Sequence, residues 1–347
     1  MKIIHTADLH LDSALETNLG YKAKKRRQEL ISAFEKLVEY AKQEKVRLVL
    51  ISGDIFDHNN ATPRTFTRVA DIISNAGDID FLLLSGNHDS LNNFSQYEAL
   101  PSNLKTFSDS WQYYSYENFC IAGINLNASN KSVMPTSLAL DEDNYNIVML
   151  HTEIESVKTA LRDKNIDYLA LGHIHKHDIG KIDNRATWAY SGCLEARGFD
   201  ESGKKGFVLL DTEENRIEFI ESSIRTMYEI EVDISDIESY TQIKNKVFDE
   251  IHNSGATSED MVKLVLVGTY TLNTDKGIEN LADQLEREYY FSKFKDKTKM
   301  KICIDDFKNS VSLKGEFVRS VYASDLSDEQ KEKIMLLGIR AIEGEEI

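Results

Sequence analysis

Five short segments in the first half of the chain carry residue types that bind transition metals. Each places Asp, Asn or His just after a run of apolar residues. Two segments have the spacing Asp-x-His or His-x-His, in which the two side chains of an extended segment point the same way and reach one ion. The candidate ligands are Asp8, His10, Asp54, Asn87, His151, His173 and His175. This mixture of oxygen and nitrogen donors suits Mn²⁺, Fe or Zn²⁺ better than a thiolate site or an all-oxygen calcium cage.

Such a set of ligands is too large for one ion with an open coordination position. It suits two ions about 3.5–4 Å apart that share a bridging carboxylate, as in metal-assisted hydrolysis of phosphoesters. His88 follows Asn87 and is the candidate to donate a proton to the leaving oxygen. Asp57 could accept a hydrogen bond from the other ring nitrogen of His88 and hold that ring in place. The predicted catalytic residues are therefore His88 and Asp57.

A structural hydrogen-bond network at the strand ends is the alternative interpretation of these residues. It is disfavoured because buried carboxylates and imidazoles are costly without an ion or another partner. The glycines before Asp54 and Asn87 also fit a site, since they would let the backbone turn sharply and bring both side chains to the sheet edge.

Strands and helices alternate along the segments that must position these ligands. Apolar strands are expected at 2–6, 47–51, 80–84, 147–150 and 168–171, with amphipathic helices at 30–41 and from Thr62-Pro63, where Thr is the N-cap. Ligands in open α/β sheets bind beyond the carboxyl ends of the strands, so the loops after these strands should converge. Near-continuous apolar strands also require that both faces of the sheet are covered.

Further along the chain, short strands are expected at 178–182, 187–191, 207–211 and 217–222, and they complete a second sheet. A new cycle of strands at 228–232, 263–267 and 300–304 and helices at 237–252 and 278–290 follows, and a last helix begins at Ser327 with capping-box spacing. The predicted fold is α/β, with a two-sheet αββα core over 1–224 and a smaller C-terminal α/β domain over 225–347.

Composition is that of a folded, water-soluble protein. The 347 residues include 41 basic and 58 acidic side chains, which gives a net charge of −17, and 41% are apolar. No apolar run is long enough to span a membrane, and the N-terminus has no signal-peptide pattern. The three cysteines form no CxxC pair, which fits a reducing cytoplasm. We therefore expect a cytoplasmic protein that does not bind nucleic acid indiscriminately.

Taken in order, the motifs resemble the calcineurin-like metallophosphoesterase superfamily. They are Asp-x-His, Gly-Asp-x-x-Asp, Gly-Asn-His-Asp, a lone His, and Gly-His-x-His. The resemblance implies that Asp8, His10, Asp54 and His175 hold one ion. It implies that Asp54, Asn87, His151 and His173 hold the second, with Asp54 bridging. Two divalent ions are expected, Mn²⁺ before Fe or Zn²⁺.

Finer features resemble the SbcD-type DNA repair exonucleases, close to the YhaO-like bacterial group. These are the opening Ile-His-Thr-Ala-Asp-Leu-His-Leu-Asp, then Ser-Gly-Asp-Ile-Phe-Asp, and the segment from Tyr190 to Phe199 followed by Glu201. The likeness implies an exonuclease on DNA ends whose C-terminal α/β domain caps the DNA. Asp57 departs from archaeal and eukaryotic members, which usually carry His there. The implied partners are DNA, an SbcC-like ATPase subunit and a second copy in a homodimer.

DNA as substrate requires basic surface, because phosphate contacts dominate affinity. The candidate phosphate-binding residues are Lys25, Arg26, Arg27 and Arg197. Each could equally belong to a solvated face or an internal salt bridge. Two other functions remain open: a phosphodiesterase or phosphatase for small nucleotides or phosphoproteins, and a DNA-binding scaffold without turnover that serves an ATPase.

Overall fold

The computed structural model describes residues 1–57, 62–86, 100–130, 134–214, 216–271, 274–302 and 304–344. Contacts within the chain divide it into two compact units, Met1–Met227 and Tyr228–Ile347. Among the described helices, none has the length and apolar character needed to cross a membrane.

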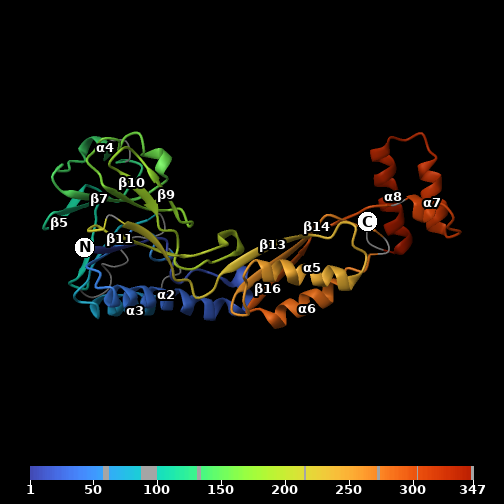
Figure 1. The fold of residues 1–347 in the computed structure, drawn as a ribbon, viewed down its shortest axis with the longest axis horizontal. Coiled ribbons are helices and arrows are strands. Elements are labelled where there is room, and N and C mark those ends of the chain that lie inside the picture. The colour runs from blue at the N-terminus through green and yellow to red at the C-terminus, as the bar shows by residue number, and fades with distance from the viewer. Residues whose placement is uncertain are drawn as a thin grey trace. The chain divides into compact units, whose positions relative to one another are not determined.

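Two six-stranded mixed sheets form the first unit (Figure 1). In the first sheet, β1 (Lys2–Thr6), β2 (Leu48–Ile51), β3 (Asp80–Leu83) and β4 (Leu104–Thr106) run parallel, and β11 (Gly206–Asp211) and β12 (Arg216–Glu221) add antiparallel beside β1. In the second sheet, β6 (Phe119–Gly123), β7 (Tyr145–His151), β8 (Tyr168–Gly172) and β10 (Thr187–Tyr190) run parallel, flanked by antiparallel β5 (Gln112–Tyr116) and β9 (Asp178–Lys181). The predicted two-sheet α/β core is thus confirmed.

The alternation of side chains along each strand explains why two sheets pack together. Ile3, Leu48 and Leu82 are fully or almost fully buried in one cluster with Ile147 and Ala170 of the second sheet. Residues of opposite phase face the helices that cover the first sheet, α2 (Ala23–Gln43) and α3 (Pro63–Ser74) (Figure 1). Helix α3 begins as its sequence predicts, with Pro63 in its first turn. Two short helices, α1 (Glu16–Leu19) and α4 (Met134–Ser137), complete the unit.

The second unit is a smaller α/β assembly followed by a pair of helices. Its three-stranded sheet has the order β13 (Met227–Asp233), β14 (Met261–Val267) and β16 (Phe291–Asp296), and α5 (Tyr240–Asn253) and α6 (Ile278–Glu288) bury their apolar faces in the same core. A short pair, β15 (Thr269–Tyr270) and β17 (Lys299–Met300), follows. Then α7 (Leu313–Tyr322) packs on α8 (Asp328–Glu343), whose N-cap Ser327 forms the predicted capping box with Gln330.

The expected strand at 300–304 is wrong. Strand β17 ends at Met300, and a 3-10 helix begins at Ile304. The paired strand is instead β16, whose alternating lysines obscure its strand character in the sequence. It pairs with β14 over six residues, from Met261 opposite Phe291 onward. Burial against a neighbouring strand therefore outweighs the low β-propensity of lysine.

Candidate metal centre

The carboxyl ends of four parallel strands bring the predicted ligands together. Asp8 and His10 follow β1, Asp54 follows β2, His151 ends β7, and His173 follows β8. The loops after β1 and β2 are joined by backbone hydrogen bonds, from Asp8 N to Gly53 O at 3.0 Å and from His10 N to Asp54 O at 3.0 Å. Two strands of each sheet thus contribute to one site at a shared edge.

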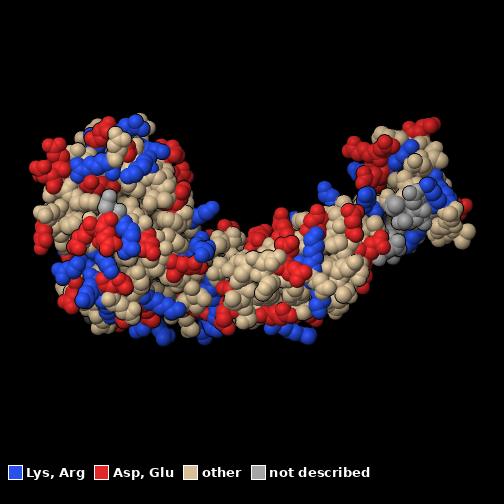
Figure 2. Space-filling view, viewed as in Figure 1, with Lys and Arg blue, Asp and Glu red and all other residues tan. Residues whose placement is uncertain are grey.

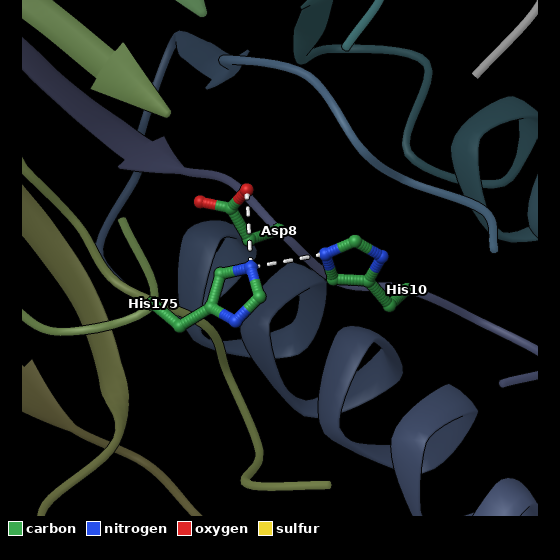
Figure 3. A group of neighbouring side chains, drawn as sticks. All are labelled: Asp8, His10 and His175. Atoms are coloured by element: carbon green, nitrogen blue, oxygen red, sulfur yellow. Dashed lines mark hydrogen bonds and ion pairs between the residues drawn. The ribbon is translucent and has the colours of Figure 1, made fainter. Parts of the chain in front are cut away.

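Asp8, His10 and His175 form the first group of donor atoms (Figure 3). The two Nε2 atoms of His10 and His175 lie 3.2 Å apart, and His175 Nε2 lies 3.8 Å from Asp8 Oδ1. All three ligand atoms lie within 4.8 Å of one another. Asp8 and His10 are almost completely buried, whereas 28% of the His175 side chain is exposed.

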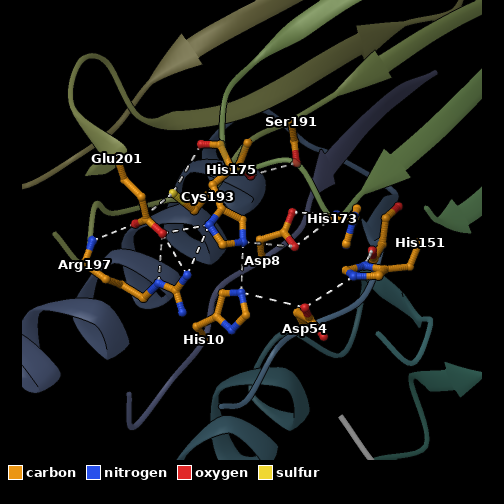
Figure 4. A network of polar contacts seen from close by, with 12 residues as sticks. Asp8, His10, Asp54, His151, His173, His175, Ser191, Cys193, Arg197 and Glu201 are labelled. Carbon is orange, nitrogen blue, oxygen red and sulfur yellow. Dashed lines mark hydrogen bonds and ion pairs between the residues drawn. The ribbon is translucent and has the colours of Figure 1, made fainter. Parts of the chain in front are cut away.

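Asp8, Asp54 and His151 form a second group that overlaps the first (Figure 4). Asp54 Oδ2 lies 3.3 Å from His151 Nε2 and 3.7 Å from His10 Nε2. The Asp54 carboxylate therefore lies between one histidine of each predicted ligand set, which is the position that a bridging ligand needs.

His173 lies beside these groups without joining either among the described residues. Its ring packs edge-on against His151 with centroids 5.4 Å apart, and its backbone N–H donates to both oxygens of Asp8 at 3.1 Å. Its Nε2 lies 3.9 Å from Glu153 Oε1. Asn87 and His88 lie outside the described residues, so their predicted roles stay predictions.

The backbone at the site is not extended, contrary to the reasoning from Asp-x-His spacing. Asp8 has φ 54°, His10 φ 44°, Asp54 φ 52° and His173 φ 97°. Left-handed backbone is uncommon for residues other than glycine and gathers at functional sites. The ligands thus reach one place through tight local turns, which the surrounding hydrogen bonds hold in position.

Two glycines make room for the ligands. Gly53 has φ +94°, as expected for a sharp turn before Asp54. Gly86 is needed for a different reason from the predicted turn, because a Cβ at this position would overlap the Asp54 carboxylate. Asp54 can occupy its place only because the backbone of the neighbouring strand end carries no side chain there.

Partners of the other ring nitrogens leave Nε2 of two histidines available to a cation. His151 Nδ1 lies 2.9 Å from the Ser52 carbonyl, and His175 Nδ1 lies 2.7 Å from Glu201 Oε1. A carbonyl or carboxylate oxygen only accepts, so each Nδ1 carries the proton and each Nε2 keeps its lone pair.

Electrostatics at the site favour a cation. Burial raises the pKa of Asp8 to about 6, against the opposing effect of His151 and His175. Burial lowers the pKa of His151, but the Asp54 and Asp8 carboxylates outweigh it and raise the pKa to about 9. The buried carboxylates thus hold positive charge close to them. Two carboxylates with converging imidazole nitrogens are a donor set that fits a divalent transition metal.

The predicted phosphate-binding residues have different surroundings. Arg26 is fully buried and pairs with Glu195 at 2.5 Å and Glu29 at 3.1 Å, so the prediction that it contacts DNA is wrong. Arg27 pairs with Glu16 at 2.6 Å, and Lys25 is exposed.

Arg197 lies at the site, where 19% of its side chain is exposed and its guanidinium forms an ion pair with Glu201 at 2.7 Å. Asp57 donates its backbone N–H to the Leu11 carbonyl at 3.1 Å, and its predicted contact with His88 lies outside the described residues. Glu201 is the site residue that reasoning from the sequence left without a role. A Glu shortly after Gly-His-x-His is part of the family resemblance, but no spacing rule links it to a histidine 26 residues earlier.

Comparison with known proteins agrees with this geometry. The sequence profile described as calcineurin-like phosphoesterase matches residues 1–177. The chain is 26% identical over 332 residues to a protein of Bacillus subtilis named uncharacterized metallophosphoesterase YhaO, which covers 84% of this chain and 79% of that protein. It is 24% identical over 294 residues to the SbcD component of the nuclease SbcCD in Staphylococcus epidermidis, covering 71% and 76%.

A third relative is the DNA double-strand break repair protein Mre11 of Methanosarcina acetivorans. It is 26% identical over 247 residues, which cover 65% of this chain and 39% of the archaeal protein. The chain thus matches about two fifths of the length of that relative. The resemblance inferred from the strand-end motifs is confirmed. With a profile that covers just over half of its residues, the chain belongs to the calcineurin-like phosphoesterase family.

Proposed function

We propose that this protein is a metal-dependent phosphodiesterase that hydrolyses DNA, as an exonuclease on DNA ends in repair. The observation that carries the proposal is the convergence of Asp8, His10, Asp54, His151 and His175 into two overlapping groups of donor atoms. The names of two relatives, a double-strand break repair protein and a component of a nuclease, support DNA as the substrate.

The proposed ligand sets are those implied by the family motifs. Asp8, His10, Asp54 and His175 would hold one ion, and Asp54, Asn87, His151 and His173 would hold the other. The position of Asp54 Oδ2, within 3.3 Å of His151 Nε2 and 3.7 Å of His10 Nε2, supports it as the bridge. Two divalent ions, with Mn²⁺ expected, supply Lewis-acid stabilisation of charge on the phosphoryl oxygens and lower the pKa of the attacking water.

The protein's own residues would orient the substrate and move the proton. His88 is proposed to donate a proton to the leaving oxygen, with Asp57 holding its ring. A cavity of about 410 Å³ opens beside His151 and His173, and Asn127, Thr152 and Ser156 are among its lining residues. These side chains offer hydrogen bonds to a nucleotide next to the metal ligands.

DNA contacts are proposed for Lys25, Arg27 and Arg197. Figure 2 shows Lys and Arg interspersed with Asp and Glu over the visible face of the first unit. Local basic side chains near the site, rather than overall charge, would therefore supply the phosphate contacts. An SbcC-like ATPase and a second copy of this chain are the proposed protein partners, and the cytoplasm is the proposed location.

Metal-dependent hydrolysis of end-labelled linear duplex DNA tests the proposal. The parent protein, freed of metal and then given Mn²⁺, should shorten the duplex. Asp54→Asn should reduce the rate to background because it weakens the bridge. Asp283→Asn, at an exposed carboxylate in the second unit, is the matched control and should retain the parent rate.

Bis(p-nitrophenyl) phosphate and nucleotides serve as competing substrates in the same assay. Hydrolysis of these compounds without hydrolysis of DNA would replace the DNA proposal with one for small phosphoesters. DNA binding by the parent without any hydrolysis would refute the enzyme and support a scaffold.

A further inference from the structure

We propose that Glu201, held by Arg197, is a positioning residue that fixes the His175 ring so that Nε2 faces the first ion. The inference rests on the proposed metal centre and concerns how one of its ligands is oriented. His175 follows the end of β8 in a loop, and 28% of its side chain is exposed. A ring in that position needs a partner to fix its orientation.

Glu201 supplies that partner with both of its oxygens in use (Figure 4). Oε1 accepts from His175 Nδ1 at 2.7 Å and from the Arg197 guanidinium at 2.7 Å, and Oε2 accepts from the Arg197 backbone N–H at 2.8 Å. Only 8% of the Glu201 side chain is exposed. The carboxylate is thus held in one orientation from two directions.

The charge of Glu201 is maintained by the same contacts. Burial alone would raise the pKa of this carboxyl, but the hydrogen bond with His175 and the charge of Arg197 outweigh burial and hold the pKa far below its ordinary value. Glu201 therefore acts as an acceptor throughout the physiological range.

An ionised carboxylate determines which nitrogen of His175 carries the proton. Because Glu201 can only accept, Nδ1 must donate, and the lone pair remains on Nε2. Arg197 also approaches Nδ1, at 3.1 Å, but its guanidinium has only donors and thus cannot remove that proton. The Nε2 lone pair then points toward His10 and Asp8, where the first group of ligand atoms meets.

The backbone on both sides of this pair is anchored. Lys205 Nζ donates to the His175 carbonyl at 2.8 Å. Fully buried Arg26 holds the segment before Arg197, through Glu195 and through the Ala196 carbonyl at 2.9 Å. Glu201 and Arg197 are therefore mounted on a rigid frame, which is what a residue that orients a ligand requires.

His151 provides an internal comparison. Its Nδ1 is held by the backbone carbonyl of Ser52, which no side-chain substitution removes. Loss of Glu201 should therefore weaken the ion held by Asp8, His10 and His175 while leaving the ion near His151 largely unchanged. Partners of this kind typically change metal affinity about 10- to 100-fold.

Calorimetric titration of metal-free protein with Mn²⁺ tests the inference. Glu201→Ala should weaken one of two binding phases about 10- to 100-fold, and Glu201→Gln, which keeps an acceptor, should recover part of the loss. Long-range ¹H–¹⁵N NMR of the metal-free protein should show His175 protonated at Nδ1 in the parent and a mixture of tautomers in Glu201→Ala. Glu29→Gln removes another buried carboxylate, one paired with Arg26 and Arg225, and should leave both phases intact.

The outcomes separate this inference from the metal centre itself. If the parent binds no Mn²⁺, the proposed centre fails. If the parent binds two ions and Glu201→Ala binds both as tightly, with the His175 tautomer unchanged, the positioning role is refuted. Equal weakening of both phases by Glu29→Gln would also refute it, because general destabilisation would then explain the effect. Should Glu201→Ala fail to fold, the Glu201→Gln titration and spectrum decide alone.

Discussion

Raising the pH should strengthen Mn²⁺ binding near His151. In the metal-free protein, burial lowers the pKa of His151, but the Asp54 and Asp8 carboxylates raise it to about 9. At pH 7 the ring is therefore an imidazolium, and an ion that binds Nε2 must displace its proton. As the pH approaches 9, this competition disappears.

The structure gives the size of the effect. Each pH unit below the pKa costs about tenfold in apparent affinity, or about 1.4 kcal/mol. Between pH 7 and pH 8.5 the affinity at this position should rise about 30-fold, equivalent to about 2 kcal/mol. Binding at pH 7 should release about one proton from this group.

The same proton affects the stability of the metal-free fold, in the opposite direction. The folded pKa of about 9 lies above the ordinary value of 6.5, so the proton stabilises the fold fully below pH 6.5. That stabilisation is lost as the pH rises through 9. It amounts to about 3 kcal/mol, from a difference of about 2.5 pKa units.

Isothermal titration calorimetry under anaerobic conditions measures both quantities. Titrations at pH 7.0 and 8.5 in buffers of different ionisation enthalpy, values that span about one and a half units below the pKa, give the affinity and the number of protons released. His151→Gln should lose the pH dependence, whereas His177→Gln, at a histidine bonded to the Tyr190 carbonyl, should keep it. Equal affinity at both pH values in the parent, or an unchanged slope in His151→Gln, would refute the reasoning.

Two further predictions concern the frame of the site. Gly86→Ala should weaken Mn²⁺ binding at least about tenfold in the same calorimetric assay, because its Cβ would overlap the Asp54 carboxylate. Gly77→Ala has only ordinary contact distances, and equal behaviour of the two variants would contradict the steric argument. Arg26→Met should lower the free energy of unfolding in urea by about 3–5 kcal/mol, since buried carboxylates lose their partner. Arg27→Met removes a partly exposed pair and should cost about 1 kcal/mol or less, and similar losses for both would disprove the burial argument.

The environment of Arg26 was readable in part from the sequence. Its position on α2 has the helical period of Leu30, Ala33 and Leu37, which are all buried. Its membership of a basic cluster suggested an exposed side chain, and the helical phase was the better guide. The identity of its partner was not readable, because Glu195 lies 169 residues away.

Local sequence was enough to identify the strand ends that carry metal-binding side chains, and hence the family. This follows because an apolar run and the polar residue after it are neighbours along the chain, as with His151 at the end of β7. Only the folded chain revealed that Asp8 and Asp54 reach their places through left-handed backbone, and that Glu201 lies against His175. Those features depend on contacts between segments far apart in sequence, and residue spacing carries no information about the geometry in which such segments meet.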